Sequence, residues 1–401
     1  MQGSSYEKGR RWAGACLVAL AAVLAGCGSL PTNVGRNDSV ALPISAESPL
    51  VKIARASQPS PEQSGARLMP LGAFSLEARI ELAQRATSSL DVQYYVLEND
   101  PTGRLLMAAM RDAAVRGVRV RLLVDDLYTT HTDALLRGLS SFPNVEVHLF
   151  NPFCCARSAG VAGRYAASLF DFGRLNHRMH NKLFIADGVM AVAGGRNIAD
   201  EYFLRAADAN FVDMDAFVMG AVVKDFAAIF DRYWNSEVVF PIGLVGAPIG
   251  DPEAARKAFD ATMASLPAAP PIDPPSTDVL GYGPIREELD SGQLGLIWGK
   301  ARAFADPPEK LLAMTPKIAY ETSVTSSVMM QIWQAKSDLV LTSPYLIPGQ
   351  MGVTSFQNLQ RDKVKVTVVT TRSPPPTSRS FTTAIRAIAR PSSMPASIST
   401  S

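Results

Sequence analysis

Apolar positions along the first half of the chain recur with two alternating spacings. Stretches with the three- and four-residue spacing of an amphipathic helix alternate with short runs that are typical of strands. The predicted helices are Ser75–Ser88, Leu105–Val115 and Ala134–Leu139. The predicted strands are Leu90–Leu97, Val118–Val124 and Val145–Phe150. This alternation favours an α/β fold with a mixed, mainly parallel sheet flanked by helices.

The same order of helix, strand, helix and strand occurs a second time later in the chain. The segment Ala335–Tyr345 resembles Ala86–Tyr95, and Asp362–Val369 resembles Arg116–Leu123. Self-similarity of this kind is typical of a duplicated fold. We therefore expect two lobes.

Composition sets the boundaries of these lobes. Residues 28–66 are rich in Ser, Pro, Asn and Gly without a sustained period, which predicts a tether. The first lobe is expected at 67–243 and the start of the second at 318–370. Residues 244–317, which begin with a Pro- and Ala-rich stretch, are expected to connect them, and 371–401 to form an aberrant, disordered tail.

The N-terminus resembles a bacterial lipoprotein signal. A basic stretch that ends at Arg11 precedes a short apolar run, which ends in Leu24–Cys27. We expect a signal peptide over residues 1–27, lipid attachment at Cys27 and anchoring to the cell envelope, facing the periplasm. Gly28 after the cysteine favours the outer membrane. The alternative is an ordinary signal peptide with an incidental cysteine.

The overall composition indicates a folded chain with no strong excess of charge. Of 401 residues, 47% are apolar and 19% are charged, which is typical of a globular protein. The formal net charge is +2, which argues against a protein that mainly binds polyanions. No nucleic acid is therefore expected as a partner.

The most informative segment carries His180 and Lys182, followed by Asp187-Gly188. Residues two apart on a strand share a face, so His180 and Lys182 should point the same way. Asp-Gly between two apolar runs predicts a two-residue hairpin turn, after which the chain returns as the strand Val189–Ala193.

Residues after the predicted hairpin favour a phosphate site. Gly194 and Gly195 would let backbone amides approach a phosphate closely. Asn197 adds a side-chain donor, and the helix-like segment Ile198–Leu204 would direct its N-terminus at the same place.

Together these residues fit phosphodiester chemistry, which needs a nucleophile, neutralisation of the phosphate oxygens and an acid for the leaving group. His180 would attack phosphorus, provided that a carboxylate orients its ring, while Lys182 and Asn197 would hold the oxygens. No metal or other cofactor is expected. Taken singly, His180 would be a structural histidine and Lys182 a solvated charge. A lysine two residues and an aspartate seven residues after one of the four histidines should occur by chance in only about one in a hundred such sequences, before the glycines are counted.

The segment matches the phospholipase D superfamily pattern at all six of its positions, namely His180, Lys182, Asp187, Gly194, Gly195 and Asn197. The flanking text over 93–126, 195–202 and 230–236 resembles the cardiolipin synthase branch. The resemblance implies a phospholipase D-like fold, a phospholipid substrate and a phosphohistidine intermediate on His180. It also places Asp187 among the catalytic residues, mainly in a structural or supporting role.

The sequence departs from the family in one respect, because family members bring two such motifs to one site. There, one histidine attacks and the other protonates the leaving group. Here the last of the four histidines is His180, so the second motif is absent from this sequence. We expect the second lobe to be incomplete and the activity of a monomer to be doubtful. A homodimer could bring two copies of His180 together.

The residues after Thr370 lose the helix–strand pattern. When a sequence typical of the family is written in GC-rich codons and translated one base late, it gives the residues of this tail. We therefore expect residues from about 371 onward to be frameshifted, in place of a continuation of about 100 residues. The alternative is a natural Ser- and Pro-rich tail.

Three functions remain open. The first is a cardiolipin synthase-like phosphatidyltransferase or phospholipase D that acts on membrane phospholipids. The second is a nuclease-like phosphodiesterase formed by a single-motif dimer. The third is a catalytically inactive envelope lipoprotein. Lipid and DNA substrates separate the first two, and His180→Ala separates both from the third.

Overall fold

The structure is a computed structural model that describes residues 30, 38–154, 157, 160–168, 171–245, 250–265, 275–311, 314–343 and 346–370. The chain divides into two compact units at residues 313 and 314. The expected signal peptide with its lipidated Cys27, and the expected aberrant tail, lie outside the described residues. No helix in the described ranges is both long enough and apolar enough to cross a bilayer.

The first unit is built on a nine-stranded sheet with the order β8-β4-β3-β2-β5-β6-β7-β1-β9. The strands are β1 (Ser64–Met69), β2 (Ser89–Tyr94), β3 (Arg119–Asp125), β4 (Val145–Phe150), β5 (Leu183–Ala186), β6 (Met190–Gly194), β7 (Asp215–Gly220), β8 (Val239–Pro241) and β9 (Ile297–Gly299). The α/β class and the mixed sheet are confirmed. The prediction of a mainly parallel sheet is wrong, because only β2, β3 and β4 pair in parallel among these strands. Beyond β4, β5 pairs antiparallel with β2, and β6 pairs antiparallel with β5 and β7; only β5 and β6 are joined by a tight turn.

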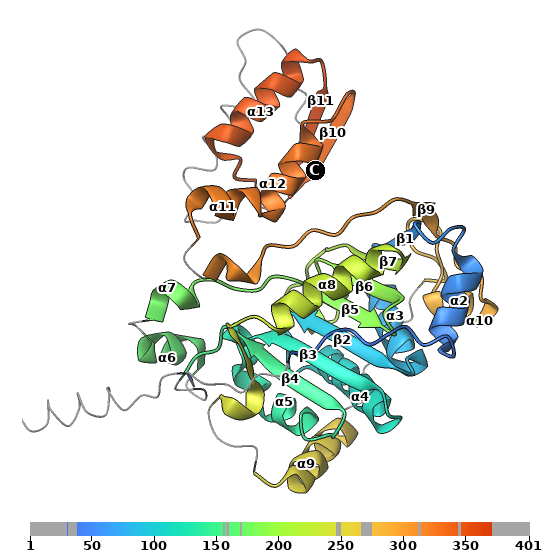
Figure 1. Ribbon diagram of the computed structural model, residues 1–401, viewed down its shortest axis with the longest axis vertical. Helices are drawn as coiled ribbons and strands as arrows, with labels where there is room; N and C mark the ends of the chain where they lie inside the picture. Colours follow the sequence, from blue (N-terminus) through green and yellow to red (C-terminus); the bar gives the residue numbers. More distant parts are fainter. Residues whose placement is uncertain are drawn as a thin grey trace, which may run out of the picture. The chain divides into compact units, whose positions relative to one another are not determined.

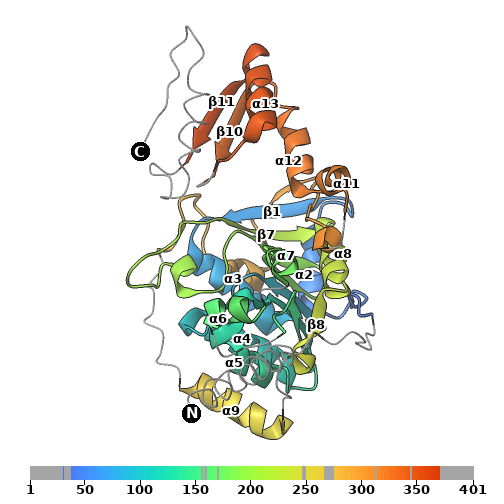
Figure 2. The ribbon, with the colours of Figure 1, turned by 90° about the vertical axis from the view of Figure 1, so that its left-hand side faces the viewer.

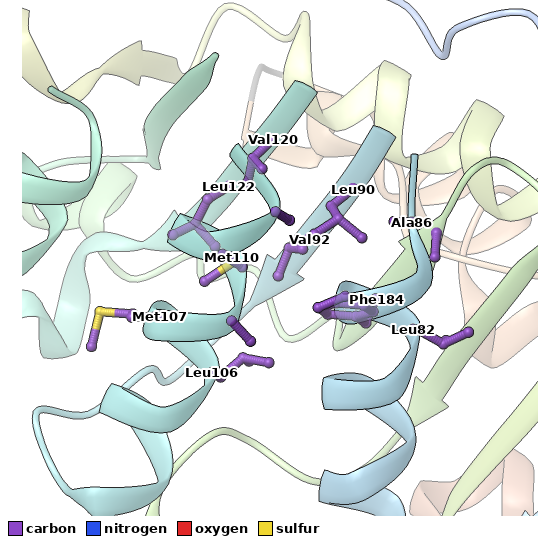
Figure 3. Packing of buried hydrophobic residues seen from close by; sticks show 14 of the residues in the cluster. Leu82, Ala86, Leu90, Val92, Leu106, Met107, Met110, Val120, Leu122 and Phe184 are labelled. Carbon is purple, nitrogen blue, oxygen red and sulfur yellow. The ribbon is translucent and has the colours of Figure 1, made fainter. Parts of the chain in front are cut away.

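Helices cover both faces of this sheet. On one face lie α3 (Gly72–Arg85), α4 (Pro101–Val115) and α5 (Asp133–Leu139), and on the other lies α8 (Val222–Trp234) (Figure 1, Figure 2). Figure 3 shows Leu82 of α3 and Met110 of α4 with Leu90, Val92 and Phe184 of the strands. Alternate strand residues form a second cluster with α8. The period of two therefore divides the core into two layers.

Further helical segments complete the described part of the first unit. They are α2 (Pro49–Ser57), η1 (Asp126–His131), α6 (Gly160–Ala167), α7 (Phe172–Leu175), η3 (Asp200–Phe203), η4 (Ile242–Leu244), α9 (Pro252–Ala264), α10 (Ile285–Ser291) and η5 (Pro308–Leu311).

The prediction that residues 28–66 and 244–317 are simple linkers is wrong, because parts of both ranges belong to the folded first unit. Within 28–66, α2 contacts α3, and β1 begins at Ser64 and pairs with β7. Within 244–317, α9 contacts α5, α10 contacts α3, and β9 pairs with β1. The buried guanidinium of Arg67 explains why β1 lacks an apolar pattern, since it pairs with Glu288 just after α10 begins.

The predicted hairpin is confirmed, but three residues (Asp187, Gly188 and Val189) join its strands instead of the predicted two, and the return strand begins at Met190. β5 and β6 pair antiparallel, with Ala186 opposite Met190. The turn residues Asp187 and Gly188 both have positive φ, at 49° and 69°. This is the backbone geometry that favours Asp-Gly in two-residue hairpin turns.

The second unit contains α11 (Pro316–Glu321), α12 (Val324–Ile332), β10 (Asp338–Thr342), α13 (Gly349–Arg361) and β11 (Lys365–Val369). β10 and β11 pair in parallel, as β2 and β3 do. The predicted repeat extends to the register. Leu339 faces Val366, and the residues that the sequence comparison makes equivalent, Leu90 and Val120, also face each other.

Candidate active site

Several strand ends meet at one edge of the nine-stranded sheet. β5 is antiparallel to β2, with Gln93 opposite Leu183, so β5 begins beside the carboxyl end of β2. For the same reason β6 ends and β7 begins at this edge. His180 and Lys182 lie in the segment just before β5. They therefore occupy the carboxyl edge of the parallel strands, where α/β proteins generally bind ligands.

Side chains alternate along the segment that leads into β5. Asn181 hydrogen-bonds Tyr233 of α8, and Leu183 packs in the cluster beneath the same helix. His180 and Lys182 alternate with these residues, and both lie against Tyr95. They therefore share a face, as the strand period predicts.

His180 and Lys182 converge on the ring of Tyr95, the residue that follows β2. The imidazole stacks on this ring, with centroids 3.9 Å apart and planes inclined by 23°. Lys182 Nζ lies 5.6 Å from the centroid of the same ring, and it donates a hydrogen bond to the His180 carbonyl at 2.8 Å. The two groups thus contact the same aromatic ring, and His180 is exposed to solvent.

Burial and charge set the protonation of both groups. Partial burial, and then the nearby ammonium of Lys182, lower the pKa of His180 below its usual value of 6.5. At neutral pH the imidazole is therefore mainly neutral and keeps a lone pair for attack. Burial also lowers the pKa of Lys182, while the carboxylates of Asp213 and Asp215 oppose that shift and favour the ammonium.

The main chain before His180 is held by Asp125, the last residue of β3. Its carboxylate accepts the Met179 N–H at 2.9 Å and contacts Arg178 Nη1 at 3.1 Å. Burial raises the pKa of Asp125 to about 6, although Arg178 and the Met179 N–H lower it. Asp125 is therefore a positioning residue for His180. No carboxylate in the described part of the chain hydrogen-bonds the imidazole itself. The carboxylate that was expected to orient the His180 ring is therefore not found among the described residues.

The predicted glycine cradle for phosphate has a different role in the structure. The N–H of Gly195 donates to the carbonyl of Met214 at 3.0 Å, and that of Gly194 points to the Lys182 carbonyl at 3.4 Å. A Cβ at either position would overlap an aspartate, Asp215 at Gly194 and Asp213 at Gly195. The glycines therefore make room for two carboxylates beside Lys182, and their amides are occupied by the protein.

Asn197 lies at the same edge, and its buried side chain links other segments. Its Oδ1 accepts the N–H of Val96 at 3.1 Å, and its Nδ2 donates to the Tyr202 hydroxyl at 2.9 Å. These bonds hold the chain after β6 beside the chain after β2. Asn197 supports the site through this connection.

Asp187 does not join His180 and Lys182, because it lies at the opposite end of β5, in the hairpin turn. Its carboxylate accepts the backbone N–H groups of Ser88 at 2.8 Å and Ser89 at 3.0 Å. It also accepts the Ser48 hydroxyl at 2.5 Å and the Thr87 N–H at 3.1 Å. The expectation that Asp187 is catalytic is therefore corrected. It fastens the hairpin to the start of β2.

Two acidic residues and one aromatic residue of the site were missed by the sequence reasoning. Asp213 and Asp215 act on Lys182, and Asp215 is held by Arg79 at 3.0 Å with both side chains fully buried. Burial alone would raise the pKa of Asp215, but Arg79 and the Ser75 hydroxyl hold it below its usual value. The available signal was the spacing of two between Asp213 and Asp215, at the start of β7. Tyr95 could be predicted to lie on a strand, and its contact with His180 requires the fold.

No group of three or more metal-ligating side chains occurs in the described ranges. His177, three residues before His180, directs Nδ1 to the Gly173 carbonyl at 3.0 Å.

Comparison with known proteins agrees with this geometry. Residues 79–234 match the family described as cardiolipin synthase, PLD-like domain. The chain is 39% identical over 306 residues to cardiolipin synthase C of Escherichia coli. Residues 79–234 therefore form a domain of the phospholipase D superfamily. Within it, the similarity is to the cardiolipin synthase branch.

Each match covers a different share of this chain and of the protein to which it is compared. The match to cardiolipin synthase C covers 75% of it and 60% of that protein. An uncharacterized protein of Helicobacter pylori is 31% identical over 318 residues, or 78% of this chain and 60% of that protein. The crystal structure of a phosphatidylserine synthase of Haemophilus influenzae Rd KW20 gives a TM-score of 0.47 at 12% identity, over 80% of this chain and 66% of that one. The chain thus spans about 60% of the length of the curated relatives that it matches.

Proposed function

We propose that this chain cleaves or transfers phosphodiester bonds of membrane phospholipids, as a cardiolipin synthase-like enzyme of the phospholipase D family. The observation that carries the proposal is the convergence of His180 and Lys182 on the Tyr95 ring at an exposed sheet edge. The similarity to cardiolipin synthase C supports phospholipid as the substrate class.

In the proposed reaction, the neutral imidazole of His180 attacks the phosphorus. A P–N bond forms while the bond from phosphorus to the leaving alkoxide breaks, which gives a phosphohistidine. The ammonium of Lys182 neutralises the non-bridging oxygens as charge develops on them. Water or a second alcohol then attacks the phosphorus, the P–N bond breaks and the imidazole is restored. Hydrolysis and transfer therefore share their first step.

The leaving alkoxide also needs a proton, and the sequence carries a single His-x-Lys-x4-Asp motif. We propose that His180 of a second copy supplies this proton within a homodimer, and that it takes a proton back from the attacking water or alcohol in the second step. A monomer would then lack the general acid, which typically contributes a factor of about 10²–10⁴ in rate.

The proposed location follows from the N-terminal sequence. A lipid on Cys27 would anchor the chain to the cell envelope on the periplasmic side, with a preference for the outer membrane. Such an anchor would keep the site beside its phospholipid substrate.

Lipid mass spectrometry of cells that express the chain tests the proposed function. We expect the wild type to raise the level of cardiolipin or phosphatidic acid, and His180→Asn and Lys182→Met to abolish the rise. His177→Asn, which changes a nearby exposed histidine, is the matched control and should behave as the wild type. An unchanged lipid profile with the wild type, or a full rise with His180→Asn, would exclude the proposal.

A further inference from the structure

The loop that joins η3 to β7, residues 204–214, presents large apolar side chains to solvent. Val212 is 95% exposed, Leu204 54%, Phe211 52% and Met214 44%. Single exposed apolar residues are common on protein surfaces, but several on one short loop indicate a contact surface.

Hydrogen bonds within the loop fix this exposure. The Phe211 N–H donates to the Glu201 carbonyl at 2.8 Å. The side chain of Asn210 binds both main-chain groups of Ala206, accepting its N–H at 3.0 Å and donating to its carbonyl at 2.8 Å. The Phe211 ring also packs on Tyr202, with centroids 4.9 Å apart. The loop therefore has a defined conformation in which its apolar side chains face outward.

The loop adjoins the candidate active site at both of its ends. Near its start, the hydroxyl of Tyr202 accepts a hydrogen bond from Asn197. Near its end, Asp213 acts on Lys182, and the Met214 carbonyl accepts the Gly195 N–H. The exposed residues 211 and 212 directly precede Asp213 in the chain, so the apolar surface continues from the edge of the site.

We propose that this loop inserts its apolar side chains into the acyl-chain region of a phospholipid bilayer. The inference rests on the proposed function, because a phosphate held at His180 and Lys182 is joined to its acyl chains by only a short glycerol unit. Those chains must therefore leave the site over a neighbouring surface. The loop carries one basic residue, Arg205, and two acidic ones, Asp208 and Asp213. Its contact with lipid is accordingly apolar and does not depend on anionic headgroups.

Tryptophan fluorescence of the full chain tests the insertion without any need for catalysis. Val212→Trp is compared with Val279→Trp, because Val279 is 89% exposed in a turn before α10. The probe is a vesicle of phosphatidylcholine and phosphatidylglycerol with brominated acyl chains, and unbrominated vesicles are the reference. We expect bromine to quench the added tryptophan at 212, and to quench the Val279→Trp chain no more than the parent. Equal quenching of the two variants would overturn the inference.

Turnover separates a failure of this inference from a failure of the proposed function. Val212→Asp should lower turnover of phosphatidylglycerol vesicles by about tenfold or more, and turnover of a soluble short-chain phosphodiester by less than about twofold. Val279→Asp should leave both rates unchanged. Full vesicle turnover by Val212→Asp would sink the loop contact alone. Absence of turnover by the wild type on either substrate would sink the proposed function, while the quenching result would still decide on insertion.

Discussion

At the level of single residues, the site depends on groups that fix a neutral imidazole. The Tyr95 ring supports one face of His180, and Asp125 holds the main chain just before it. Lys182 contributes a positive charge beside the same ring. These contacts favour a nucleophile whose proton is already lost at neutral pH.

The pKa of His180 should fall below 6.5, and loss of the Lys182 charge should raise it. In the proposed homodimer one imidazole must be neutral to attack and the other protonated to donate, so activity should rise and then fall with pH around the pKa of His180. Because Lys182 lowers this pKa, Lys182→Met should shift the titration to higher pH.

Nuclear magnetic resonance of nitrogen-labelled histidine measures this titration even when turnover is lost. Asp125→Asn is the control, because the Asp125 carboxyl, with a pKa of about 6, titrates in the same range. A downward shift in Lys182→Met would contradict the arrangement of charges.

Asp187 should matter for stability and not for the chemical step. Asp187→Ala leaves the partly buried N–H of Ser88 and the buried N–H of Ser89 without their acceptor, so we expect the free energy of unfolding to fall by about 3 kcal/mol. Turnover per folded molecule should stay within about twofold.

Thermal unfolding and active-site titration together test this prediction. Glu287→Ala, which removes an exposed carboxylate in the first turn of α10, should cost less than about 1 kcal/mol. A large loss of turnover in fully folded Asp187→Ala would restore Asp187 to a catalytic role.

At the level of secondary structure, the sequence predicted the elements whose signals are local. The Asp-Gly turn and the β2–α4–β3 unit follow from turn chemistry and apolar spacing. β1 could not be predicted, because its buried Arg67 is neutralised by Glu288, far away in the chain. The positions of His180 and Lys182 on one side followed from the strand period. The true roles of Gly194, Gly195 and Asp187 depend on contacts with other segments, which no local pattern contains.

The two glycines at the end of β6, Gly194 and Gly195, should respond differently to an added methyl group. At Gly194 the new Cβ would meet the main chain of Met214 and Asp215 as well as the buried Asp215 carboxylate. At Gly195 it would meet the Asp213 carboxylate, the end of a partly exposed side chain that can move. We therefore expect Gly194→Ala to lower the melting temperature strongly, and Gly195→Ala to lower turnover with a smaller effect on melting.

Gly173→Ala, whose Cβ would meet nothing within 4 Å, is the control for both variants. Calorimetry and turnover of the three proteins check the order. Equal melting temperatures for Gly194→Ala and Gly195→Ala would contradict the close approach of the β7 backbone.

At the level of the whole molecule, the chain repeats one supersecondary unit in two compact units. The parallel pairs β2–β3 and β10–β11 have the same register, and only the first unit carries the His-x-Lys pair. In the proposed homodimer the second imidazole comes from another copy of the chain, which would make activity a property of the assembly.

Mixing experiments test the proposed homodimer. If each site needs His180 from two copies, dilution of wild-type chains with His180→Asn should lower activity as the square of the wild-type fraction. An equal mixture would then retain about one quarter of the activity. A linear decrease would show that one chain suffices, and analytical ultracentrifugation of the same samples would report the assembly state.

Trapping of the covalent intermediate decides whether His180 is the nucleophile. The wild type is mixed with phospholipid labelled at phosphorus, quenched during turnover and digested, and the labelled peptide is sequenced. We expect an acid-labile, alkali-stable label on His180, absent from His180→Asn and present in His177→Asn. Turnover without label on His180, or label on another residue, would contradict the mechanism.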